Sequence, residues 1–485
     1  MMIGIDFGTT NSAVAVYRPG SSEIIETIDG SDYMPSVVAD TPDGLLTGEA
    51  AYRQLRRNPE FTFTNVKRYL GREFSEQEHG HFHLAEGPDG KVWWQGRTTL
   101  LSGPILVAEV LKSLLLAAEV RLGRKPTGAV IAVPVDFREP QRAAILEAAA
   151  IAGLKKVELF EEPYCAALAY SLDREKFERL LVYDFGGGTF DATILKSKGG
   201  HSKPLGMSGS AQIGGADFDQ RLADYAVNQF FEREGEDLRA YPKQMVGILR
   251  AAEDAKKSLS RSDAADIEEP NVAFPKSGLA SLRERVTRDQ FEDMTEDLVK
   301  RTVDSVNDAL AQANMTADQI DAVLLVGGQS RMPMIRDVLA ALFGDKKIAK
   351  NGPRPEQAVA LGAAIRAAEL DGRIKPNVMQ RLVNSSVGIR VSGGGYHAFI
   401  KKGETFPIRR ERVIRPAFDD QTELELLVYQ GDDPTASHNT LVFSHIVPLE
   451  YPSQRVPIML DLDPSGQLLV WVAGAIVYGE LEDAA

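Results

Sequence analysis

Apolar and polar residues follow two different periods along the chain, and the change between them falls near residue 370. Before it, apolar residues recur three and four positions apart, which is the spacing of one helix face. These stretches predict helices over 105–122, 141–152, 250–259 and 295–313. Runs of consecutive apolar residues predict buried strands over 129–133 and 322–326. Strands that alternate with helices indicate an α/β architecture with sheets flanked by helices.

After residue 370 the helical spacing stops, and short alternating segments bounded by Gly, Pro and Asp replace it. Such segments are typical of half-buried β-strands. They predict strands over 386–391, 396–400, 422–429, 440–447, 456–462 and 467–472. We therefore expect a linker over 371–383 and an all-β, sandwich-like domain over 384–485, preceded by a larger α/β domain over 1–370.

One short motif occurs twice in the larger domain. The segment 5–10 (Ile-Asp-Phe-Gly-Thr-Thr) recurs in form at 183–189 (Tyr-Asp-Phe-Gly-Gly-Gly-Thr), and each copy leads into a strand-like stretch, 13–16 and 192–195. Each copy is thus a strand, a tight Gly/Thr turn and a second strand. Because two copies this far apart do not form a stacked array, we interpret them as equivalents in two related lobes, over about 1–180 and 181–370.

Composition and charge narrow the class of protein. With 485 residues, 44% hydrophobic and 26% charged, the chain has the size for two or three domains and the balance of a globular protein. No apolar run approaches a bilayer span and the N-terminus lacks a secretory signal, so we expect a cytoplasmic protein with no membrane partner. A net charge of -14 disfavours nucleic acid as a partner. The lone cysteine, Cys165, fits a reducing compartment.

The two turns carry groups suited to a phosphorylated ligand. In the first, Gly8 lets the backbone approach closely, while Thr9 and Thr10 offer N–H and hydroxyl donors to phosphate oxygens. Asp6 and Asp184 precede the two turns, so two carboxylates are available for a hydrated Mg²⁺. A single such turn is more often a structural hairpin, and neither copy fits GxxxxGK[ST] or a GxGxxG that opens a helix. The pairing of the turns is what favours a triphosphate site.

A third turn with glycines follows the strand predicted over 322–326. The segment 326–331 (Val-Gly-Gly-Gln-Ser-Arg) allows close backbone approach to a flat base or ribose. An ordinary strand-to-helix turn is the alternative, and this segment by itself does not distinguish the two.

Together these segments resemble the DnaK-type heat-shock 70 chaperone family over nearly the whole chain. The similar segments stand in the family's order: 4–12, 133–134 with 141–142, 162–163 with 166–170, 183–191, 251–260, 326–333 and 358–364. The resemblance implies an actin-like, two-lobed ATPase domain of the hexokinase and heat-shock 70 type, followed by a β-sandwich. It implies ATP or ADP with Mg²⁺ as ligands, K⁺ as a further candidate, and extended or unfolded peptide segments and a nucleotide-exchange factor as partners.

The resemblance assigns catalytic or metal-binding roles to five side chains. Asp6 and Asp184 correspond to the residues that bind hydrated Mg²⁺, and Thr189 belongs to the phosphate turn of the second copy. Lys67 corresponds to the lysine that meets the γ-phosphate and the attacking water, and Glu162 to the carboxylate that orients this water. Without the family, Lys67 would be interpreted as one more solvated base.

The nucleotide contacts that the resemblance implies come from six segments. They are Gly8, Thr9, Thr10, Asn11, Gly186, Gly187, Gly188, Gly214, Gly215, Glu253, Lys256, Lys257, Ser260, Gly327, Gly328, Gln329, Arg331, Met332 and Glu356. The four within 253–260 are three and four positions apart and so share one helix face. By sequence alone that helix would be a solvated charged surface, and solvation is also expected for Arg68 and Glu161.

Two further sets are implied. Pro134 and Arg142 match residues through which the family couples nucleotide state to the surface between its domains, although a proline that ends a strand is usually only a stop. The positions that line the family's groove for extended peptides correspond to Ile389, Val391, Ser392, Ile414, Ala417, Leu424 and Leu426. A peptide there would gain backbone hydrogen bonds and one central side-chain pocket. Alternation alone would equally make these residues sandwich core.

Three features depart from the family. The family's linker is a run of leucines with an aspartate, whereas 377–383 is Asn-Val-Met-Gln-Arg-Leu-Val, so we expect weakened interdomain coupling. Glu158 stands where the family has a basic residue used with J-domain cochaperones, so we expect such a partner to be absent or different. The sequence ends near the end of the β domain, without a helical lid, and peptide binding should therefore be weak and fast.

Two other functions of the actin-like superfamily remain open at this point. A small-molecule kinase would use the same phosphate turns but needs an aspartate that faces its substrate. A filament-forming structural protein would use the same nucleotide. Neither explains residues 384–485, and a phosphotransfer assay over metabolites, or pelleting with ATP, would distinguish them.

Overall fold

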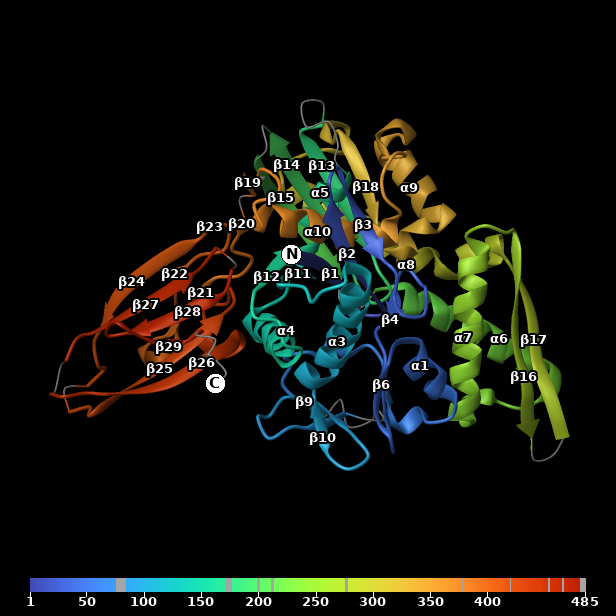
Figure 1. The fold of residues 1–485 in the computed structure, drawn as a ribbon, viewed down its shortest axis with the longest axis horizontal. Coiled ribbons are helices and arrows are strands. Elements are labelled where there is room, and N and C mark those ends of the chain that lie inside the picture. The colour runs from blue at the N-terminus through green and yellow to red at the C-terminus, as the bar shows by residue number, and fades with distance from the viewer. Residues whose placement is uncertain are drawn as a thin grey trace.

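The computed structural model describes residues 1–75, 84–170, 177–198, 201–210, 213–274, 278–376, 378–379, 381–418, 420–451, 454–464 and 466–479. The strands after residue 380 stand at one end of the molecule (Figure 1). At the other end lie helix α7 (Pro242–Leu259) and the hairpin of β16 (Ala264–Phe274) and β17 (Gly278–Thr287). Among the residues described, no helix has both the length and the apolar character that a membrane span requires.

The first large sheet is built on the N-terminal hairpin. β1 (Met2–Phe7) pairs antiparallel with β2 (Asn11–Arg18) and parallel with β11 (Gly128–Val133). The sheet is completed by β12 (Val157–Glu161), β3 (Ser21–Ile25) and β4 (Met34–Pro35). All residues of β11 are buried, as expected for a strand covered on both faces, and the strand predicted over 129–133 is confirmed.

The second large sheet repeats the pairing of the first. β13 (Arg179–Phe185) pairs antiparallel with β14 (Phe190–Lys198) and parallel with β18 (Ala322–Val326). The sheet is completed by β15 (His201–Ser210) and β19 (Val378–Met379). Each copy of the repeated motif therefore occupies the turn between the two antiparallel strands at the centre of its sheet, as predicted from the sequence.

Helices cover the faces of both sheets. Between the sheets lie α5 (Glu162–Tyr170) and α10 (Ala358–Leu370), which share one buried cluster with residues of both, such as Val130 and Val182. The other face of the first sheet packs on α3 (Gly103–Leu122) and α4 (Glu139–Ile151). The other face of the second sheet packs on α6 (Gly215–Glu234), α7, α8 (Arg288–Gln312) and α9 (Pro333–Phe343). The four predicted helices are confirmed, but α7 and α8 begin earlier than the sequence indicated.

Smaller elements flank the first sheet. They are α1 (Gly48–Tyr52), α2 (Val66–Tyr69), a three-stranded sheet of β5 (Val38–Thr41), β6 (Gly44–Thr47) and β7 (Thr62–Phe63), and another of β8 (Leu84–Glu86), β9 (Val92–Gln95) and β10 (Leu100–Ser102).

The C-terminal part forms two four-stranded antiparallel sheets. The first has the order β22-β21-β25-β26: Tyr396–Ile400, Val387–Arg390, Glu423–Gln430 and Thr440–Pro448. The second has the order β24-β27-β28-β29: Ile408–Ile414, Val456–Leu462, Leu468–Val472 and Ala475–Tyr478. Both sheets contribute to one buried cluster. The six predicted strands are confirmed, whereas β24 was missed because charged residues fill its centre.

The linker predicted over 371–383 contains two short strands. β19 extends the second large sheet by pairing with β15, and β20 (Arg381–Leu382) pairs with β23 (Thr405–Phe406) of the C-terminal part. Asn377 and Gln380 of this segment lie outside the residues described. The remainder of the linker is thus held by both neighbours.

Candidate active site

The two repeated turns touch each other. A Cβ atom added to Gly187 would lie 2.1 Å from Oγ1 of Thr10, and one added to Gly188 would lie 2.6 Å from Cγ2 of Thr9. No side chain fits at either glycine, so contact between the turns requires glycine here. The structure therefore brings together the two groups of donors that the sequence assigned to phosphate.

The start of α6 is fixed to the second turn. The N–H groups of Gly215 and Ala216 donate to the carbonyls of Gly186 and Gly187, at 3.0 and 2.9 Å. Gly186 N–H in turn donates to the carbonyl of Thr189 at 3.1 Å. Gly214, at the N-cap of α6, also packs on the turn, because an added Cβ would lie 2.5 Å from the carbonyl oxygen of Gly187. The positive end of a helix dipole is consequently directed at this region, which suits an anion.

Several buried carboxylates lie next to the two turns. Burial raises the pKa of Asp6 to about 7, with Glu162 adding to the rise and Lys67 opposing it. Burial also raises the pKa of Asp184, with further contributions from the charges of Glu162 and Asp6. The acids are thus close enough to repel one another, and a hydrated divalent cation would relieve that repulsion. The donor set fits Mg²⁺ held through water, and the assignment of Asp6 and Asp184 to this metal stays a prediction.

A fourth acid at this site was missed by the sequence analysis. Burial raises the pKa of Asp191, and the charges of Asp136, Glu162 and Asp184 add to the effect. Asp191 lies on β14, opposite Asp184 in the strand pairing. The sequence offered one signal, since Asp191 is two positions after Thr189 and ends the segment 183–191 that resembles the family, but no role was assigned to it. Among the residues described, no three acidic, His or Cys side chains converge closely enough to hold a metal directly.

Lys67 and Glu162 form a nearly buried ion pair. The Nζ atom of Lys67, on α2, lies 2.8 Å from Oε1 of Glu162, the first residue of α5, and the two residues are 7% and 9% exposed. Burial alone would lower the pKa of Lys67, but the charges of Glu162, Asp6 and Asp184 outweigh it and the net shift is upward. Lys67 therefore stays charged beside the turns, and its interpretation as a solvated base is wrong.

Arg68, expected to be solvated, contacts the second phosphate turn instead. Its Nη2 donates to the carbonyl of Gly188 at 2.5 Å, and the same atom lies 3.8 Å from Oδ2 of Asp217 near the start of α6. A segment near the first sheet is thereby joined to a turn of the second. Sequence pattern alone could not distinguish this half-buried arginine from the surrounding basic residues.

The residues assigned to adenosine fall into two groups. In the first, Lys256 of α7 donates to the carbonyl of Gly215 at 2.7 Å and to Asp219 at 2.9 Å. A Cβ atom at Gly215 would lie 3.1 Å from Oε1 of Gln329, so Gln329 joins this group. Glu253 pairs with Lys257 at 2.7 Å, and Ser260 is the C-cap of α7.

The second group surrounds the third turn. Gly327 has a φ of 77°, and an added Cβ there would lie 2.9 Å from Oδ1 of Asp184, which joins this turn to the carboxylates. Gly328 begins a single 3-10 turn, and Arg331 pairs with Glu356 at 2.8 Å. Met332 is 3% exposed within the cluster of the second sheet, so its side chain faces the core. Asn11 begins β2 next to the first turn.

Side chains near the N-terminal sheets also reach α7 and β16. The hydroxyl of Tyr52 donates to Glu253 at 3.2 Å, and the guanidinium of Arg250 lies 4.7 Å from the centre of the Tyr52 ring. Arg56 pairs with Glu269 at 2.6 Å. These contacts connect segments on the two sides of the adenosine residues, and none was predicted from the sequence.

Of the residues assigned to coupling, Arg142 contacts the linker indirectly. Its Nη1 lies 3.4 Å from Oε1 of Glu161, and the same oxygen lies 2.6 Å from Nη2 of Arg381 in the linker. Glu161 is 4% exposed, so the expectation that it is solvated is wrong. Pro134 ends β11, and the carbonyl of the next residue, Val135, accepts from Asn384 of the C-terminal part. Both predicted coupling residues thus lie at the contact with that part.

Glu158, which stands where the family has a basic residue, has a partner within the chain. Arg366 of α10 donates from Nε to Oε1 of Glu158 at 2.9 Å, and from Nη1 to Glu369 at 3.0 Å. The side chain of Glu158 is 12% exposed.

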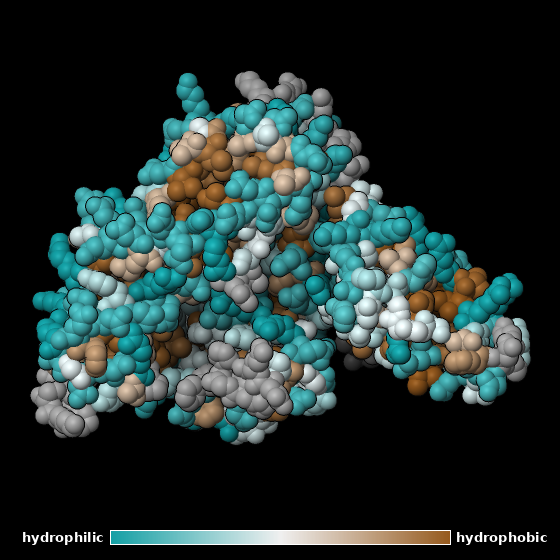
Figure 2. Space-filling model, turned by 180° about the vertical axis from the view of Figure 1, so that it is seen from behind, coloured by the Kyte–Doolittle hydropathy of each residue, from teal (hydrophilic) through white to brown (hydrophobic). Residues whose placement is uncertain are grey.

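The residues assigned to a peptide groove are divided between core and surface. Ile389, Leu424 and Leu426 belong to the buried cluster of the two C-terminal sheets, with exposures of 3%, 9% and 2%. Ile414 packs partly against it. The exposed members are Val391, Ser392 and Ala417. Figure 2 shows apolar side chains at the surface of this part, and the exposed large ones include Val391, Val413, Phe418, Leu441 and Ile446. The groove remains a prediction.

A comparison with protein families gives one finding for the chain. The model of the Hsp70 protein family matches residues 2–475. The match thus spans both large sheets, the linker and the C-terminal strands up to the start of β29.

Proposed function

The chain belongs to the Hsp70 family, and we propose that it is an ATP-dependent molecular chaperone that hydrolyses ATP and binds extended apolar peptide segments. One observation carries the proposal: the buried Lys67 and Glu162 pair stands beside two phosphate turns in mutual contact. On this view residues 1–370 are an actin-like, two-lobed ATPase domain, 371–383 a linker, and 384–485 a β-sandwich that binds peptide.

In the proposed ATPase site the protein acts mainly by positioning. Magnesium-bound ATP supplies the phosphoryl group and a metal that neutralises charge on its oxygens. Asp6 and Asp184 would hold the metal through water, while the N–H groups of the two turns hold the phosphates. Lys67 keeps a positive charge where negative charge develops, and Glu162 orients a water for in-line attack. Thr189, at the end of the second turn, completes the phosphate contacts.

The adenosine residues would bring the two halves of the site together. Lys256 and Gln329 meet at Gly215, and Gly328, where nothing lies within 4 Å of an added Cβ atom, leaves the backbone open to a flat base. Because Tyr52 and Arg56 contact Glu253 and Glu269 beside these residues, nucleotide exchange requires these cross-contacts to open. A nucleotide-exchange factor would act by favouring that opening.

In the proposed peptide site the exposed apolar residues at the ends of β21 and β24 carry the binding, with the buried cluster beneath them as support. Backbone hydrogen bonds to an extended peptide would supply affinity without sequence preference.

ATP turnover, measured with and without a panel of extended apolar peptides, tests the proposal. We expect slow basal turnover that rises with apolar peptides, and no change with charged peptides of equal length. A metabolite panel in the same assay serves as the control, because a kinase would transfer phosphate to one of its members. Turnover that no peptide alters, at concentrations up to the solubility limit, would remove the chaperone part of the proposal.

A further inference from the structure

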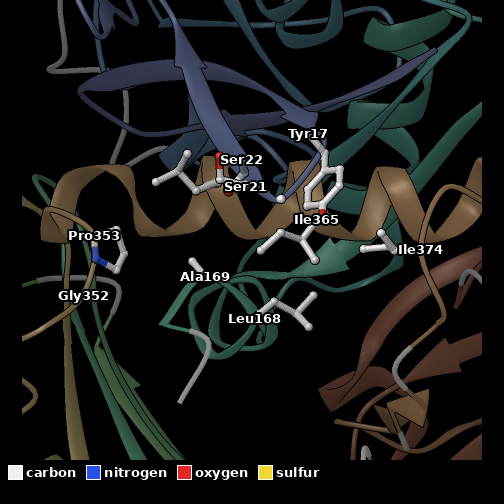
Figure 3. A pocket seen from close by; sticks show the side chains of 11 residues that line it. Tyr17, Ser21, Ser22, Leu168, Ala169, Gly352, Pro353, Ile365 and Ile374 are labelled. Atoms are coloured by element: carbon white, nitrogen blue, oxygen red, sulfur yellow. The ribbon is translucent and has the colours of Figure 1, made fainter. Parts of the chain in front are cut away.

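A cavity of about 490 Å³ lies between the β2–β3 hairpin, α5 and α10 (Figure 3). Among the described residues, none of the phosphate turns or of the C-terminal strands lines it, and the linker segment 371–383 contributes only Ile374. In the view of Figure 3, Tyr17, Ser21 and Ser22 of the hairpin face Leu168 and Ala169 of α5 across α10. Its volume is in the range of sites that take small molecules, about 300–1,000 Å³.

The lining is apolar on one side. Leu168 comes from the end of α5, Leu361 and Ile365 from α10, and Ile374 from the segment after α10. Leu361, Ile365 and Ile374 are half-buried, whereas Leu168 is 2% exposed, so the apolar surface inside the cavity comes mainly from α10 and the segment after it. Removing that surface from water is the main gain that a bound molecule could make here.

The hairpin side of the cavity is polar but uncharged. Within the chain as described, the hydroxyls of Tyr17, Ser21 and Ser22 make no hydrogen bond to protein, so they are available to a ligand. Among the residues that the structure describes, none with a carboxylate, ammonium or guanidinium group lines the cavity. The nearby Arg373 is already engaged, since it donates to the carbonyls of Tyr17 at 2.6 Å and Met2 at 3.3 Å. A charged ligand would therefore lose its hydration without gaining a partner.

We propose that this cavity binds a small, uncharged amphipathic molecule. Its apolar body lies against α5 and α10, and one hydrogen-bonding group meets the hydroxyls of the hairpin. Small residues at its edge, Gly20 and Ala169, leave space that larger side chains would fill, since nothing lies within 4 Å of a Cβ atom added at Gly20.

The cavity is joined to the candidate active site by backbone contacts. A Cβ atom at Gly362 of α10 would lie 1.7 Å from the carbonyl oxygen of Cys165 in α5, and one at Gly4 of β1 would lie 2.1 Å from the amide nitrogen of Ala364. With no side chain between them, α10 cannot shift without moving α5 or β1. Since α5 begins at Glu162 and β1 carries Asp6, a molecule that displaces α10 alters ATP turnover; this last step rests on the proposed function.

Two fluorescent probes of the same ring system test the site on the full chain. N-phenyl-1-naphthylamine is uncharged, and 8-anilinonaphthalene-1-sulfonate adds one sulfonate. We expect Ala169→Trp, which fills the cavity, to weaken binding of the uncharged probe at least tenfold, and Tyr17→Phe to weaken it several-fold. The control Val120→Ser removes an exposed apolar side chain from α3, away from the cavity and from the proposed peptide site, and should leave this affinity unchanged. The anionic probe should bind equally to the wild type and to Ala169→Trp.

Identical titrations of the uncharged probe for the wild type and Ala169→Trp would overturn the site. An equal loss of the anionic probe in that variant would overturn the uncharged class of ligand. If Ala169→Trp melts well below the wild type, Ile374→Ser decides the question by the same titrations, because Ile374 is half-buried and lies outside the helices. None of these measurements needs nucleotide, so they stand or fall independently of the ATPase proposal.

Discussion

Arg381 and Glu161 form a buried ion pair across 220 positions of the chain, with guanidinium Nη2 and Nε at 2.6 and 2.7 Å from the two carboxylate oxygens. Each residue is 4% exposed. Burial by itself would raise the pKa of Glu161, but the charges of Arg381 and Arg142 outweigh it and lower the pKa. The carboxylate thus stays ionised between two arginines. Glu161 directly precedes Glu162 in the chain. Arg381 of the linker therefore contacts the residue next to the proposed catalytic carboxylate.

The pair should hold the C-terminal part against α4 and β12. Removing one partner of a buried pair leaves an uncompensated charge, which costs about 3–5 kcal/mol. We expect Arg381→Ala to weaken this contact by that amount. The backbone amide of Glu139 reports this contact directly, because its N–H donates to Oε1 of Gln430 in the C-terminal part at 2.8 Å. Its hydrogen exchange should become faster in Arg381→Ala.

A matched control is available in the same part of the chain. Arg410 pairs with Glu404 at 2.8 Å, but its side chain is 42% exposed. Such a surface pair contributes about 0–1 kcal/mol, so Arg410→Ala should leave exchange at Glu139 unchanged. Wild-type exchange in Arg381→Ala would mean that the ion pair does not hold the two parts together.

Glu139 gives this contact a pH dependence. Burial raises its pKa from 4.5 to about 7, Arg142 opposes the shift, Leu468 N–H donates to the carboxylate, and Asp463 adds to the rise. Tyr478 also faces Glu139, since the acid contributes to the raised pKa of its hydroxyl. If the parts separate, Glu139 regains water and its ordinary pKa. The docked form therefore binds the proton more tightly, and acidification favours docking.

The expected size follows from linkage. Docking is most favourable below the ordinary pKa of Glu139 and is weakened as pH rises towards about 7. Between pH 8 and pH 6 the docking equilibrium should shift roughly tenfold towards contact. Exchange at amide 139, corrected for intrinsic rates, measures the shift, and Glu139→Gln should abolish it. The same shift in Glu139→Gln would assign the pH dependence to another group.

Sequence reasoning found the phosphate turns because their chemistry is local. Gly8 and Thr10 lie within one short segment, and the glycines at 186–188 lie within another. The repetition of the motif indicates that the two segments are equivalent. The contacts of Glu161 and Arg68 were not predictable, because their partners are 220 and 120 positions away and only the tertiary fold brings them together. The burial of Leu424 was equally hard to predict, because the same alternation of apolar and polar residues is expected for a strand that faces a core and for one that faces a groove.

Asp184→Asn tests the metal assignment. Its carboxylate lies among other acids, so its loss should weaken binding of Mg²⁺-ATP about tenfold or more, because a ligand to the hydrated cation is removed. Binding of ATP without Mg²⁺ should be unchanged or stronger, since repulsion of the phosphates falls. Isothermal titration with and without Mg²⁺ separates the two. Equal losses in both titrations would indicate a structural defect, and no loss in either would refute the assignment.

Lys67→Ala tests the catalytic assignment. A group that acts mainly on the transition state affects turnover more than binding, so single-turnover hydrolysis should fall about a hundredfold or more with ATP affinity nearly unchanged. Lys112→Ala is a suitable control, because Lys112 pairs with Glu109 on the exposed surface of α3. A single-turnover rate for Lys67→Ala within a few-fold of the wild type would contradict the role.

Leu424 distinguishes groove from core in the C-terminal part. It is 9% exposed, lies opposite Val447 on β26 and belongs to the cluster that both sheets share. We therefore expect Leu424→Asp to bury an unpartnered charge and to lower the melting temperature of the C-terminal transition by ten degrees or more, on the order of several kcal/mol. Phe418→Ser, at a residue 68% exposed, should leave melting unchanged.

The same two variants decide where peptide binds. If the exposed residues carry the binding, Phe418→Ser should no longer raise the fluorescence anisotropy of a labelled leucine-rich peptide. Its melting curve should stay that of the wild type. If Leu424 itself lines an open groove, Leu424→Asp melts within a few degrees of the wild type and loses the peptide, because its carboxylate then reaches water. A wild type that binds no extended peptide at any accessible concentration leaves an ATPase whose C-terminal strands serve another purpose.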